Sequence, residues 1–469
     1  MINTLYLPEL REMLQAGDTA GLREFCVALH PARVAEFMEG LTADEAWRVL
    51  QASDHDHRVD IFGFLDEPIQ VGILESVEPA ELSQLVADMP ADDRVDLLNE
   101  ADDQVVDQVL PLLPQEDRRE TIRLREFPEG TAGSVMTTEV ARLPASLTVR
   151  EALEEISRQA ADLETVYYNY VVDGDDHLLG LVSARELVVH FRSPETPIAE
   201  LMQRDVVCVL ATDDQEEVAD KVAEYDFLAI PVVDDHRRLL GIITHDDILD
   251  VLREEATEDA HLSAAVDPLQ DGYLETRLLT LAWKRGVWLA VLFAAALLTA
   301  LALRSYEADF QKVTWLVLFI PLVISSGGNT GSQSATLVIT ALTTGDITLG
   351  DWWRVVRREL LMGLCLGLFL AAAGYLCALG LTRQPMPGEG PGAPLIPPPT
   401  AVEVLVVPIT LLLVVVCGTL CGGLLPLMFR RMGLDPALMS NPFVAGIIDI
   451  AGIVIYMSVA VAMIGRLAG

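Results

Sequence analysis

A carboxylate lies in an unexpected place near the C-terminus of the chain. The stretch NPFVAGIID, residues 441–449, ends in Asp449, the only acidic residue well inside any predicted membrane span. A charged side chain near the centre of a bilayer costs about 2.5–3.5 kcal/mol on insertion scales, so it is rarely kept without a partner or a water-filled path. No Lys or Arg lies deep in the other predicted spans. We therefore favour a cation site lining a water-filled path; the alternative is a protonated Asp449 hydrogen-bonded to a neighbouring helix.

Two further residues share a helical face with Asp449. If a helix begins at Asn441, then Asn441, Ala445 and Asp449 recur every four residues, about 6 Å apart, and form a ladder of oxygens. Asn followed by Pro442 also suits a helix N-cap and first position, so capping is the alternative interpretation of Asn441. One carboxylate with neutral oxygens and no His or Cys favours a hard ion such as Mg²⁺, which commonly keeps several waters. A symmetric dimer would bring two copies of Asp449 to a shared axis.

An earlier apolar stretch carries a run of polar residues. In PLVISSGGNTGSQSATLVITAL, residues 321–342, Ser, Gly, Asn, Thr and Gln follow one another at membrane depth. Small residues permit close helix approach, and hydroxyl or amide groups would be costly if they faced lipid. The run predicts either part of the same polar path or helix–helix contacts with no transport role.

Acidic side chains also cluster outside the apolar region. Two sets have helical or near-helical spacing: Asp247, Asp250, Glu254 and Glu258, with Glu255 and Asp259 beside them, and Asp92, Asp93, Asp96 and Glu100. Most exposed acids simply keep a protein soluble. A strong acidic excess, however, creates self-repulsion that bound cations would relieve. A divalent-ion sensor is therefore the second interpretation of these clusters.

The charge is divided unevenly along the 469 residues, whose formal net charge is -38. Residues 1–280 contain 61 acidic and 21 basic residues, whereas residues 281–469 contain 9 and 11. An acidic soluble part therefore precedes a nearly neutral apolar part. This balance argues against nucleic-acid binding, which needs a basic surface, and favours a cationic partner. The chain contains no Walker A motif for an ATP-driven pump and no Cys/His spacing typical of a metal site.

The apolar part predicts five transmembrane helices, near residues 287–303, 315–342, 360–381, 401–428 and 443–465. The N-terminus lacks the features of a signal peptide, so we expect the acidic part to be cytoplasmic. The charges that flank the spans agree with the positive-inside rule. The inner flanks would hold Lys284, Arg285, Arg354, Arg357, Arg358, Arg430 and Arg431, and the outer flanks Arg304, Lys312, Arg383 and Arg466. The C-terminus and the segment QPMPGEGPGAPLIPPPT would then be external.

The acidic part divides into helical and repeated blocks. Residues 1–130 have helical spacing of apolar side chains, which predicts an α-helical bundle or superhelix. VVDGDDHLLGLVSARELV at 171–188 repeats as VVDDHRRLLGIITHDDIL at 232–249, with a period of 61 residues. This repeat resembles a tandem pair of cystathionine-β-synthase (CBS) domains. A helical segment connects it to the first span.

Taken together, these motifs resemble the MgtE family of bacterial magnesium channels. The resemblance covers nearly the whole chain and is most specific in PLVISSGGNTGSQSA and LDPALMSNPFVAGIIDIAGIVIY. It implies a homodimeric Mg²⁺ channel with its pore at the membrane dimer interface, where Asn441, Ala445 and Asp449 hold a hydrated ion. It also implies cytosolic Mg²⁺ sensor sites at Asp92, Asp96, Asp226, Asp247, Asp250, Glu255, Glu258, Asp259 and Asp435. Some members bind ATP in the CBS pair, which would involve Tyr170, Arg185, Phe227 and Thr244.

We thus expect a multi-domain fold: an acidic α-helical N-domain at 1–130, an α/β tandem CBS pair at 131–255, a connecting helix at 256–282 and an all-α pore domain with five spans at 283–469. The expected function is Mg²⁺ uptake across the inner membrane, with closure when cytosolic Mg²⁺ fills the acidic sensor, and no enzymatic activity. The alternatives are transport of other divalent cations such as Mn²⁺ or Co²⁺, and a membrane-bound Mg²⁺ or nucleotide sensor that does not conduct.

Overall fold

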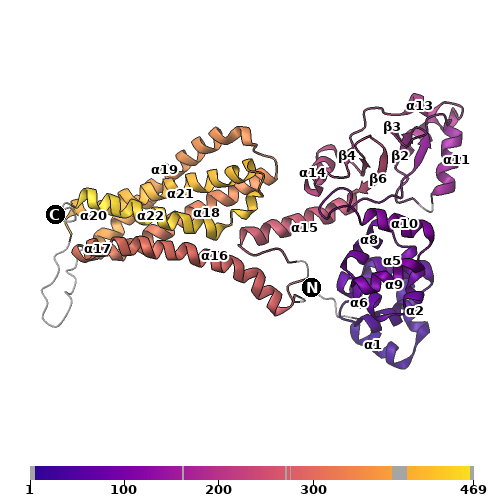
Figure 1. Ribbon diagram of the computed structural model, residues 1–469, viewed down its shortest axis with the longest axis horizontal. Coiled ribbons are helices and arrows are strands. Elements are labelled where there is room, and N and C mark those ends of the chain that lie inside the picture. The colour runs from indigo at the N-terminus through magenta and orange to yellow at the C-terminus, as the bar shows by residue number, and fades with distance from the viewer. Residues whose placement is uncertain (1–5, 161–162, 270–271, 275, 383–398, 465–469) are drawn as a thin grey trace. The chain divides into compact units, whose positions relative to one another are not determined.

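The computed structural model describes residues 6–160, 163–269, 272–274, 276–382 and 399–464. The chain forms two compact units that divide between Arg253 and Glu254, and each is described by itself (Figure 1). Arg383, Arg466, most of the Pro/Gly-rich segment predicted to be external, and the C-terminus lie outside the described residues.

The first unit begins with a stack of short helices, as the apolar spacing predicts. Polar residues start several of them: Thr42 and Glu45, for example, form a reciprocal capping box that satisfies backbone N–H groups at the start of α4. The buried faces meet in one core that includes Phe62, Leu82 and Leu98. The helices are α1 (Leu7–Ala16), α2 (Thr19–Ala28), α3 (Pro31–Met38), α4 (Ala43–Leu50), α5 (His55–Gly63), α6 (Glu67–Ser76), α7 (Pro79–Ala87), α8 (Ala91–Glu100), α9 (Asp103–Val109), η1 (Leu110–Leu112) and α10 (Gln115–Leu124).

Two small sheets follow and have the same topology, which confirms the internal repeat. Each has a parallel pair followed by an antiparallel pair, in the orders β1-β2-β3 and β4-β5-β6. Val171 pairs with Gly180 and Val232 with Gly241, and each pairing is followed by the same register irregularity. The elements are β1 (Arg142–Pro144), α11 (Val149–Gln159), β2 (Tyr168–Val172), β3 (Leu178–Ser183), α12 (Ala184–Val189), η2 (His190–Arg192), α13 (Ile198–Leu201), β4 (Val209–Leu210), α14 (Gln215–Tyr225), β5 (Ala229–Val233) and β6 (Leu239–Thr244).

The two repeats are interleaved through the Met-containing segments that precede them. The segment with Met202, at the start of the second copy, packs on Gly180 of the first, and the segment with Met136 packs on Gly241 of the second. A Cβ at Gly180 would lie 2.8 Å from the carbonyl oxygen of Gln203. The two repeats therefore form one folded domain and not two separate ones.

Helix α8 also packs on the second repeat. Ala91 and Val95 of α8 share a buried core with Ile243 of β6 and with Ile248, which lies in α15 (His245–Ser263). Because α8 and α15 both carry acidic residues, this apolar contact brings carboxylates of the two elements toward each other.

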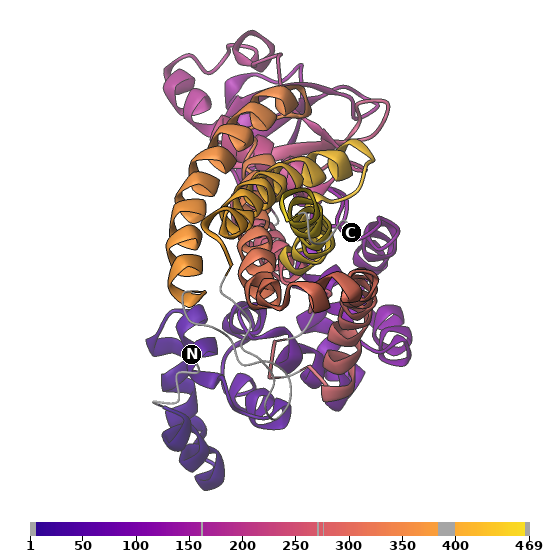
Figure 2. The same cartoon turned by 90° about the vertical axis from the view of Figure 1, so that its left-hand side faces the viewer.

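The second unit contains the end of α15 and a bundle of long helices. In the part of the chain that the structure describes, four segments are long and apolar enough to cross a membrane: 278–305, 349–381, 401–431 and 441–463. The helices are α16 (Leu278–Ser305), α17 (Glu307–Lys312), η3 (Thr314–Phe319), α18 (Ile320–Thr343), η4 (Leu349–Asp351), α19 (Trp352–Leu381), α20 (Ala401–Val404), α21 (Val406–Arg431), η5 (Pro436–Leu438) and α22 (Asn441–Met463). Figures 1 and 2 show α19, in orange, along one edge of this bundle.

The remaining predicted span corresponds to α18, which carries the polar run. Its 24 residues extend about 36 Å, enough to cross a bilayer. Gly327 and Gly331 of α18 face Gly418 and Gly422 of α21, and a Cβ at Gly418 would lie 2.6 Å from the carbonyl oxygen of Gly327. Such close backbone approach is typical of membrane helices that pack through small residues. Its crossing of the membrane stays a prediction, supported by this packing between apolar helices.

Candidate functional site

The predicted ladder on α22 lies against the polar face of α18. The two helices run in opposite directions, so residues spaced by four on one meet residues spaced by four on the other. Thr336 donates a hydrogen bond to the side-chain oxygen of Asn441, and Ser332 donates one to its carbonyl oxygen, each at 3.0 Å. Further along, a Cβ at Gly328 would lie 3.4 Å from that of Ala445 and 3.6 Å from a carboxylate oxygen of Asp449.

The geometry at Asn441 corrects the capping interpretation. The N-cap of α22 is Ser440. Asn441 is the first residue of the helix, and Pro442 is the second. The Asn441 side chain accepts from Thr336 rather than from the first turn of its own helix. Asn441 is therefore free of the capping role, and its amide belongs to the contact between α18 and α22.

Asp449 is half-buried on the same side of α22 as Asn441 and Ala445. Among the described residues, its carboxylate makes no ion pair within 4.0 Å and no hydrogen bond. Exposed polar side chains of α18 continue this surface, with Asn329 bonded to Ser325 at 3.2 Å. A single protomer thus presents a polar strip with a carboxylate on the outside of an otherwise apolar bundle.

Glu359, a carboxylate within one of the candidate spans, was not singled out from the sequence. Glu359 lies in α19, one position before the predicted span at 360–381, so Asp449 is not the only acidic residue within these helices. The Ser334 hydroxyl donates to Glu359 Oε2 at 2.6 Å. Extending the predicted apolar window by one turn would have included this residue.

In the first unit, the predicted acids of α8 and α15 come together around Asp92. The side chain of Asp92 is 8% exposed, and one of its carboxylate oxygens has no hydrogen-bond partner. Burial, then the carboxylates of Asp247, Asp93 and Glu164, raise the pKa of Asp92 well above its ordinary value. Desolvation, followed by the carboxylates of Asp247 and Asp246, raises the pKa values of Asp93 and Glu164 to about 6, although both side chains keep an exposed surface. Asp93, a member of the predicted acidic cluster but not of the implied sensor sites, and Glu164, absent from both sets, belong to this cluster.

Other predicted sensor residues of the first unit lie differently. Asp247 accepts hydrogen bonds from the backbone N–H and hydroxyl of Thr244, and burial raises the pKa of Asp247. Asp250 is exposed and pairs with Arg253 at 3.4 Å. Asp96 is exposed on α8, and Asp226 follows α14 with a left-handed backbone.

A second acidic cluster lies in the second unit. Burial, followed by the carboxylates of Asp435, Glu255 and Glu258, raises the pKa of Asp259 to about 6. Burial, Glu255 and Asp435 raise the pKa of Glu258 in the same way. Asp435 itself is the N-cap of η5, and its side chain accepts from the backbone N–H of Ala437 at 2.7 Å. The cluster joins the end of α15 to the loop that precedes α22.

Within the described residues, no three His, Cys, Asp or Glu side chains are already gathered as a metal-binding set. A divalent ion at either cluster would therefore complete its coordination with water or with small movements of the carboxylates. Mg²⁺ commonly binds in this way, since it dehydrates reluctantly and keeps several waters.

The CBS pair encloses a cavity of about 350 Å³ that contains most of the predicted nucleotide residues. Tyr170, Arg185 and Phe227 line it, and the buried hydroxyl of Tyr170 has no hydrogen-bond partner. Thr244 is not among its lining residues, and its hydroxyl donates to Asp247. Ser183 and Glu186 form the matching capping box in the first repeat, so this bond serves to begin the following helix in both copies.

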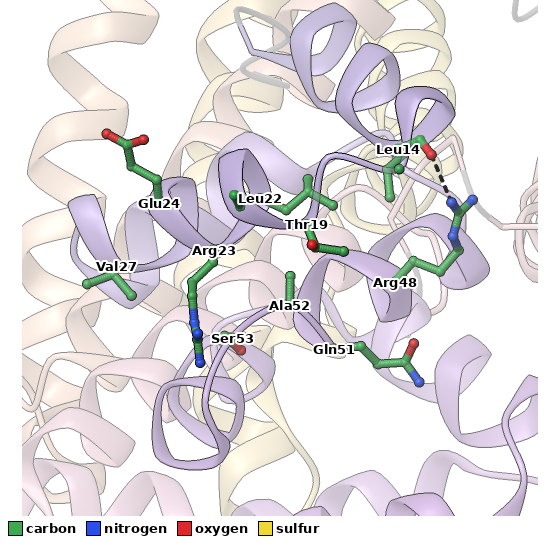
Figure 3. A pocket seen from close by; sticks show the side chains of 12 residues that line it. Leu14, Thr19, Leu22, Arg23, Glu24, Val27, Arg48, Gln51, Ala52 and Ser53 are labelled. Atoms are coloured by element: carbon green, nitrogen blue, oxygen red, sulfur yellow. Dashed lines mark hydrogen bonds between the residues drawn. The ribbon is translucent and has the colours of Figure 1, made fainter.

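A larger hollow of about 980 Å³ lies among α1, α2 and α4 (Figure 3). Arg23 and Arg48 extend in different directions along it, and Arg48 donates to the carbonyl oxygen of Leu14 at 2.9 Å. None of the predicted site residues lines this groove.

An acidic soluble unit followed by a bundle of membrane-length helices, with an unpartnered carboxylate on a polar strip, defines a membrane protein of the cation-handling class. Comparisons with known proteins agree. Residues 320–459 match the family model MgtE, described as a divalent cation transporter, residues 29–130 match the MgtE intracellular N domain, and residues 132–193 and 198–254 match the CBS domain.

Similar whole proteins and structures are known. The magnesium transporter MgtE of Thermus thermophilus is 38% identical over 96% of this chain and 97% of its own length. That of Bacillus subtilis is 29% identical over 97% and 96%. A crystal structure of the cytosolic domain of the Mg²⁺ channel MgtE in complex with ATP is 36% identical and covers 52% of this chain and 98% of its own, with a TM-score of 0.48. The chain belongs to the MgtE family, and it is a membrane transport protein rather than an enzyme.

Proposed function

We propose that the protein is a homodimeric Mg²⁺ channel of the inner membrane, which admits Mg²⁺ along a path past Asp449 and closes when cytosolic Mg²⁺ occupies its acidic clusters. The observation that carries this proposal is the unpartnered carboxylate of Asp449 on the polar strip of α18 and α22. The similarity to magnesium transporters over nearly the whole chain supports Mg²⁺ as the ion.

The polar strip itself supports a dimer with the path at its interface. Exposed Ser, Asn and Thr side chains and a carboxylate are costly against lipid, because nothing in hydrocarbon can hydrogen-bond to them. A second copy related by a two-fold axis would cover the strip and place two Asp449 carboxylates around a shared path. Their combined charge matches one divalent cation that keeps its waters.

The soluble unit supports the same dimer. Three pairs of positions separated by the 61-residue period carry exposed large apolar side chains: Tyr167 and Leu228, Val188 and Leu249, and Phe191 and Leu252. Scattered apolar residues on a surface need no explanation, but apolar residues at equivalent places in both repeats form a matched face. Such a face suits contact with a second CBS pair.

Electrostatics supports the sensor. At neutral pH the acids around Asp92 repel one another, and burial makes their ionised forms costly. A divalent cation would relieve both effects and hold α8 to α15. At the other cluster, a cation between Asp259 and Asp435 would join the end of α15 to the start of α22, the helix that carries Asp449. Ion binding in the cytosol would thereby act on the path.

The driving force needs no chemical coupling. With the acidic unit in the cytoplasm, an inside-negative potential contributes about 2.3 kcal/mol per charge per 100 mV, and twice that for a divalent ion. The proposal is tested with purified protein in liposomes that contain a Mg²⁺ indicator. Asp449→Ala should abolish Mg²⁺ entry, whereas Glu307→Gln, on the short helix α17, should not. Entry unchanged by Asp449→Ala would remove the assigned path.

The same liposomes distinguish the alternatives. Entry of Mn²⁺ or Co²⁺ at rates above that of Mg²⁺ would favour a transporter for other divalent cations. Absence of single-channel currents together with absence of flux would favour a non-conducting sensor.

ATP is a second proposed ligand, in the CBS cavity. The ring of Phe227 and the guanidinium of Arg185 offer the stacking and charge that an adenine nucleotide needs, and the orphan Tyr170 hydroxyl provides a hydrogen-bonding group. Calorimetry with ATP should give binding that Arg185→Ala weakens and that Arg23→Ala, in the separate groove, leaves unchanged. Equal affinity in all three proteins would contradict this assignment.

A further inference from the structure

Glu359 of α19 accepts hydrogen bonds from hydroxyl groups of two other helices, one at its carboxylate and one at its backbone carbonyl. Ser334 of α18, 5% exposed, donates to Glu359 Oε2 at 2.6 Å. Thr419 of α21, fully buried, donates to the backbone carbonyl of Glu359 at 3.1 Å. Glu359 makes no ion pair in the part of the chain that the structure describes. Among the described residues, no ion pair therefore explains why an acid is retained here.

The distance between Ser334 and Glu359 indicates a strong bond. O–H···O⁻ hydrogen bonds to ionised acceptors have lengths of about 2.5–2.7 Å and are roughly twice as strong as neutral ones. A Gln at position 359 could still accept a hydrogen bond, whereas an Ala could not. Comparing Gln with Ala at position 359 therefore separates the effect of losing the hydrogen-bond acceptor from the effect of losing the negative charge.

Ser334 lies between two residues that contact the ladder. Ser332 and Thr336, two positions away on either side, both donate to Asn441. At 100° per residue, a separation of two positions turns by about 200°, so Ser334 points away from the side that meets Asn441. At this level α18 is held on one side by Asn441 of α22 and on the other by Glu359 of α19.

The N-terminal half of α18 is bound differently. Around Gly327 and Gly331 it meets α21 through close backbone contacts, and the described side chains of Ser326 and Thr330 bond only within the helix. Directional bonds from α18 to its neighbours occur at the end that faces Asn441. The hydrogen bond from Ser334 to Glu359 holds α18 at this end, and it therefore also sets the distance of Ser332 and Thr336 from α22.

We propose that Glu359 is a positioning residue for ion selection: through Ser334 it sets the separation of α18 from α22 at the mouth of the ladder. The inference rests on the proposed function, because it assumes that ions pass beside Asn441. Glu359 does not touch the ion. A path of set width favours Mg²⁺ with its waters over divalent ions that lose water more readily.

Transport measurements test the selectivity. In liposomes, Ser334→Ala and Glu359→Ala should each change the ratio of Mg²⁺ to Co²⁺ entry by about fivefold, the effect expected from one hydrogen bond of about 1 kcal/mol. Glu359→Gln should keep most of the original ratio of Mg²⁺ to Co²⁺ entry. The double variant, with Ala at both positions, should change this ratio no more than either single variant does. An unchanged ratio of Mg²⁺ to Co²⁺ entry in Glu359→Ala would overturn the proposal. It would also be overturned if Glu359→Gln changed this ratio as much as Glu359→Ala does while Ser334→Ala left the ratio unchanged.

A second measurement does not depend on transport. In a protein without its native cysteines, Thr336→Cys and Asn441→Cys should form a disulfide readily, and Glu359→Ala should slow this reaction while Glu307→Gln should not. If cross-linking responds to Glu359→Ala but Mg²⁺ does not enter, the positional role holds and the proposed function fails. An unchanged cross-linking rate overturns the positional role itself.

Discussion

Thr336 of α18 donates a hydrogen bond to the side-chain oxygen of Asn441 at 3.0 Å, although the two residues are 105 positions apart. The bond joins the polar run of one helix to the first turn of another. It turns two separate sequence motifs into one surface that leads to Asp449.

This bond predicts an effect on ion binding. Thr336→Val keeps the shape of the side chain but removes the donor, so Asn441 loses a fixed orientation. We expect the Mg²⁺ concentration for half-maximal entry to rise about fivefold, since a net hydrogen bond contributes about 1 kcal/mol. Liposome flux at several Mg²⁺ concentrations measures this. Thr340→Val, on an exposed position of the same helix, is the control and should leave the value unchanged.

Close helix packing predicts a difference between two glycines. A Cβ at Gly418 would lie 2.6 Å from a backbone oxygen of α18, whereas one at Gly380 would meet nothing within 4 Å. Gly418→Ala should therefore destabilise the bundle by about 1–3 kcal/mol, the usual range for overpacking. Gly380→Ala should be neutral or slightly stabilising, because Ala favours helix. Thermal unfolding of the full chain in detergent would decide; equal midpoints would contradict the packing of α18 on α21.

Burial of Asp92 predicts opposite effects of its removal with and without Mg²⁺. In metal-free buffer, Asp92→Asn removes a costly buried charge and should slow hydrogen exchange in α8. At millimolar Mg²⁺ the original protein should gain protection in α8 and α15, and the variant should gain much less. Hydrogen exchange read by mass spectrometry measures both changes. Asp103→Asn, at the start of α9, provides the control. Equal Mg²⁺-induced protection in Asp92→Asn would show that Asp92 does not bind the ion.

The same cluster predicts a pH dependence. The pKa values of Asp93 and Glu164 are raised to about 6 and that of Asp92 is raised well above its ordinary value, so the folded unit binds protons that the unfolded chain releases. Between about pH 4 and 6 the free energy of unfolding should therefore fall as pH rises. Acids with lowered pKa values, such as Asp54 and Asp234, act in the opposite direction but at lower pH.

In metal-free buffer, the midpoint of unfolding of the first unit should accordingly be higher at pH 5 than at pH 7, by about 2–4 °C for each kcal/mol gained. Saturating Mg²⁺ at pH 7 should reduce this difference. A midpoint that rises from pH 5 to pH 7 without metal would contradict the arrangement of these acids.

Local patterns were sufficient for much of the fold. Apolar spacing predicted the helices of residues 1–130, and the 61-residue period predicted two matching sheets. Segment length predicted the four described segments that are long and apolar enough to cross a membrane, whereas the crossing of α18 stays a prediction. These features depend on residues close together in the chain, because helix period, strand alternation and span length are local properties. The position of Asp449 in an apolar helix was also visible, since the cost of such a residue depends on its immediate surroundings.

The sequence by itself thus determined the family, the order of the domains and the presence of an acidic residue, Asp449, within an apolar helix. Only the tertiary structure decided which distant groups meet: Asn441 with Thr336 rather than with its own helix end, Glu359 with Ser334, and Glu164 with Asp92. Spacing along one helix places residues on a face but does not say which face of another helix lies opposite. Which faces lie opposite each other depends on the packing between distant elements. In the helical bundle this packing is made by close glycine contacts, and in the first unit by the core that α8 and α15 share.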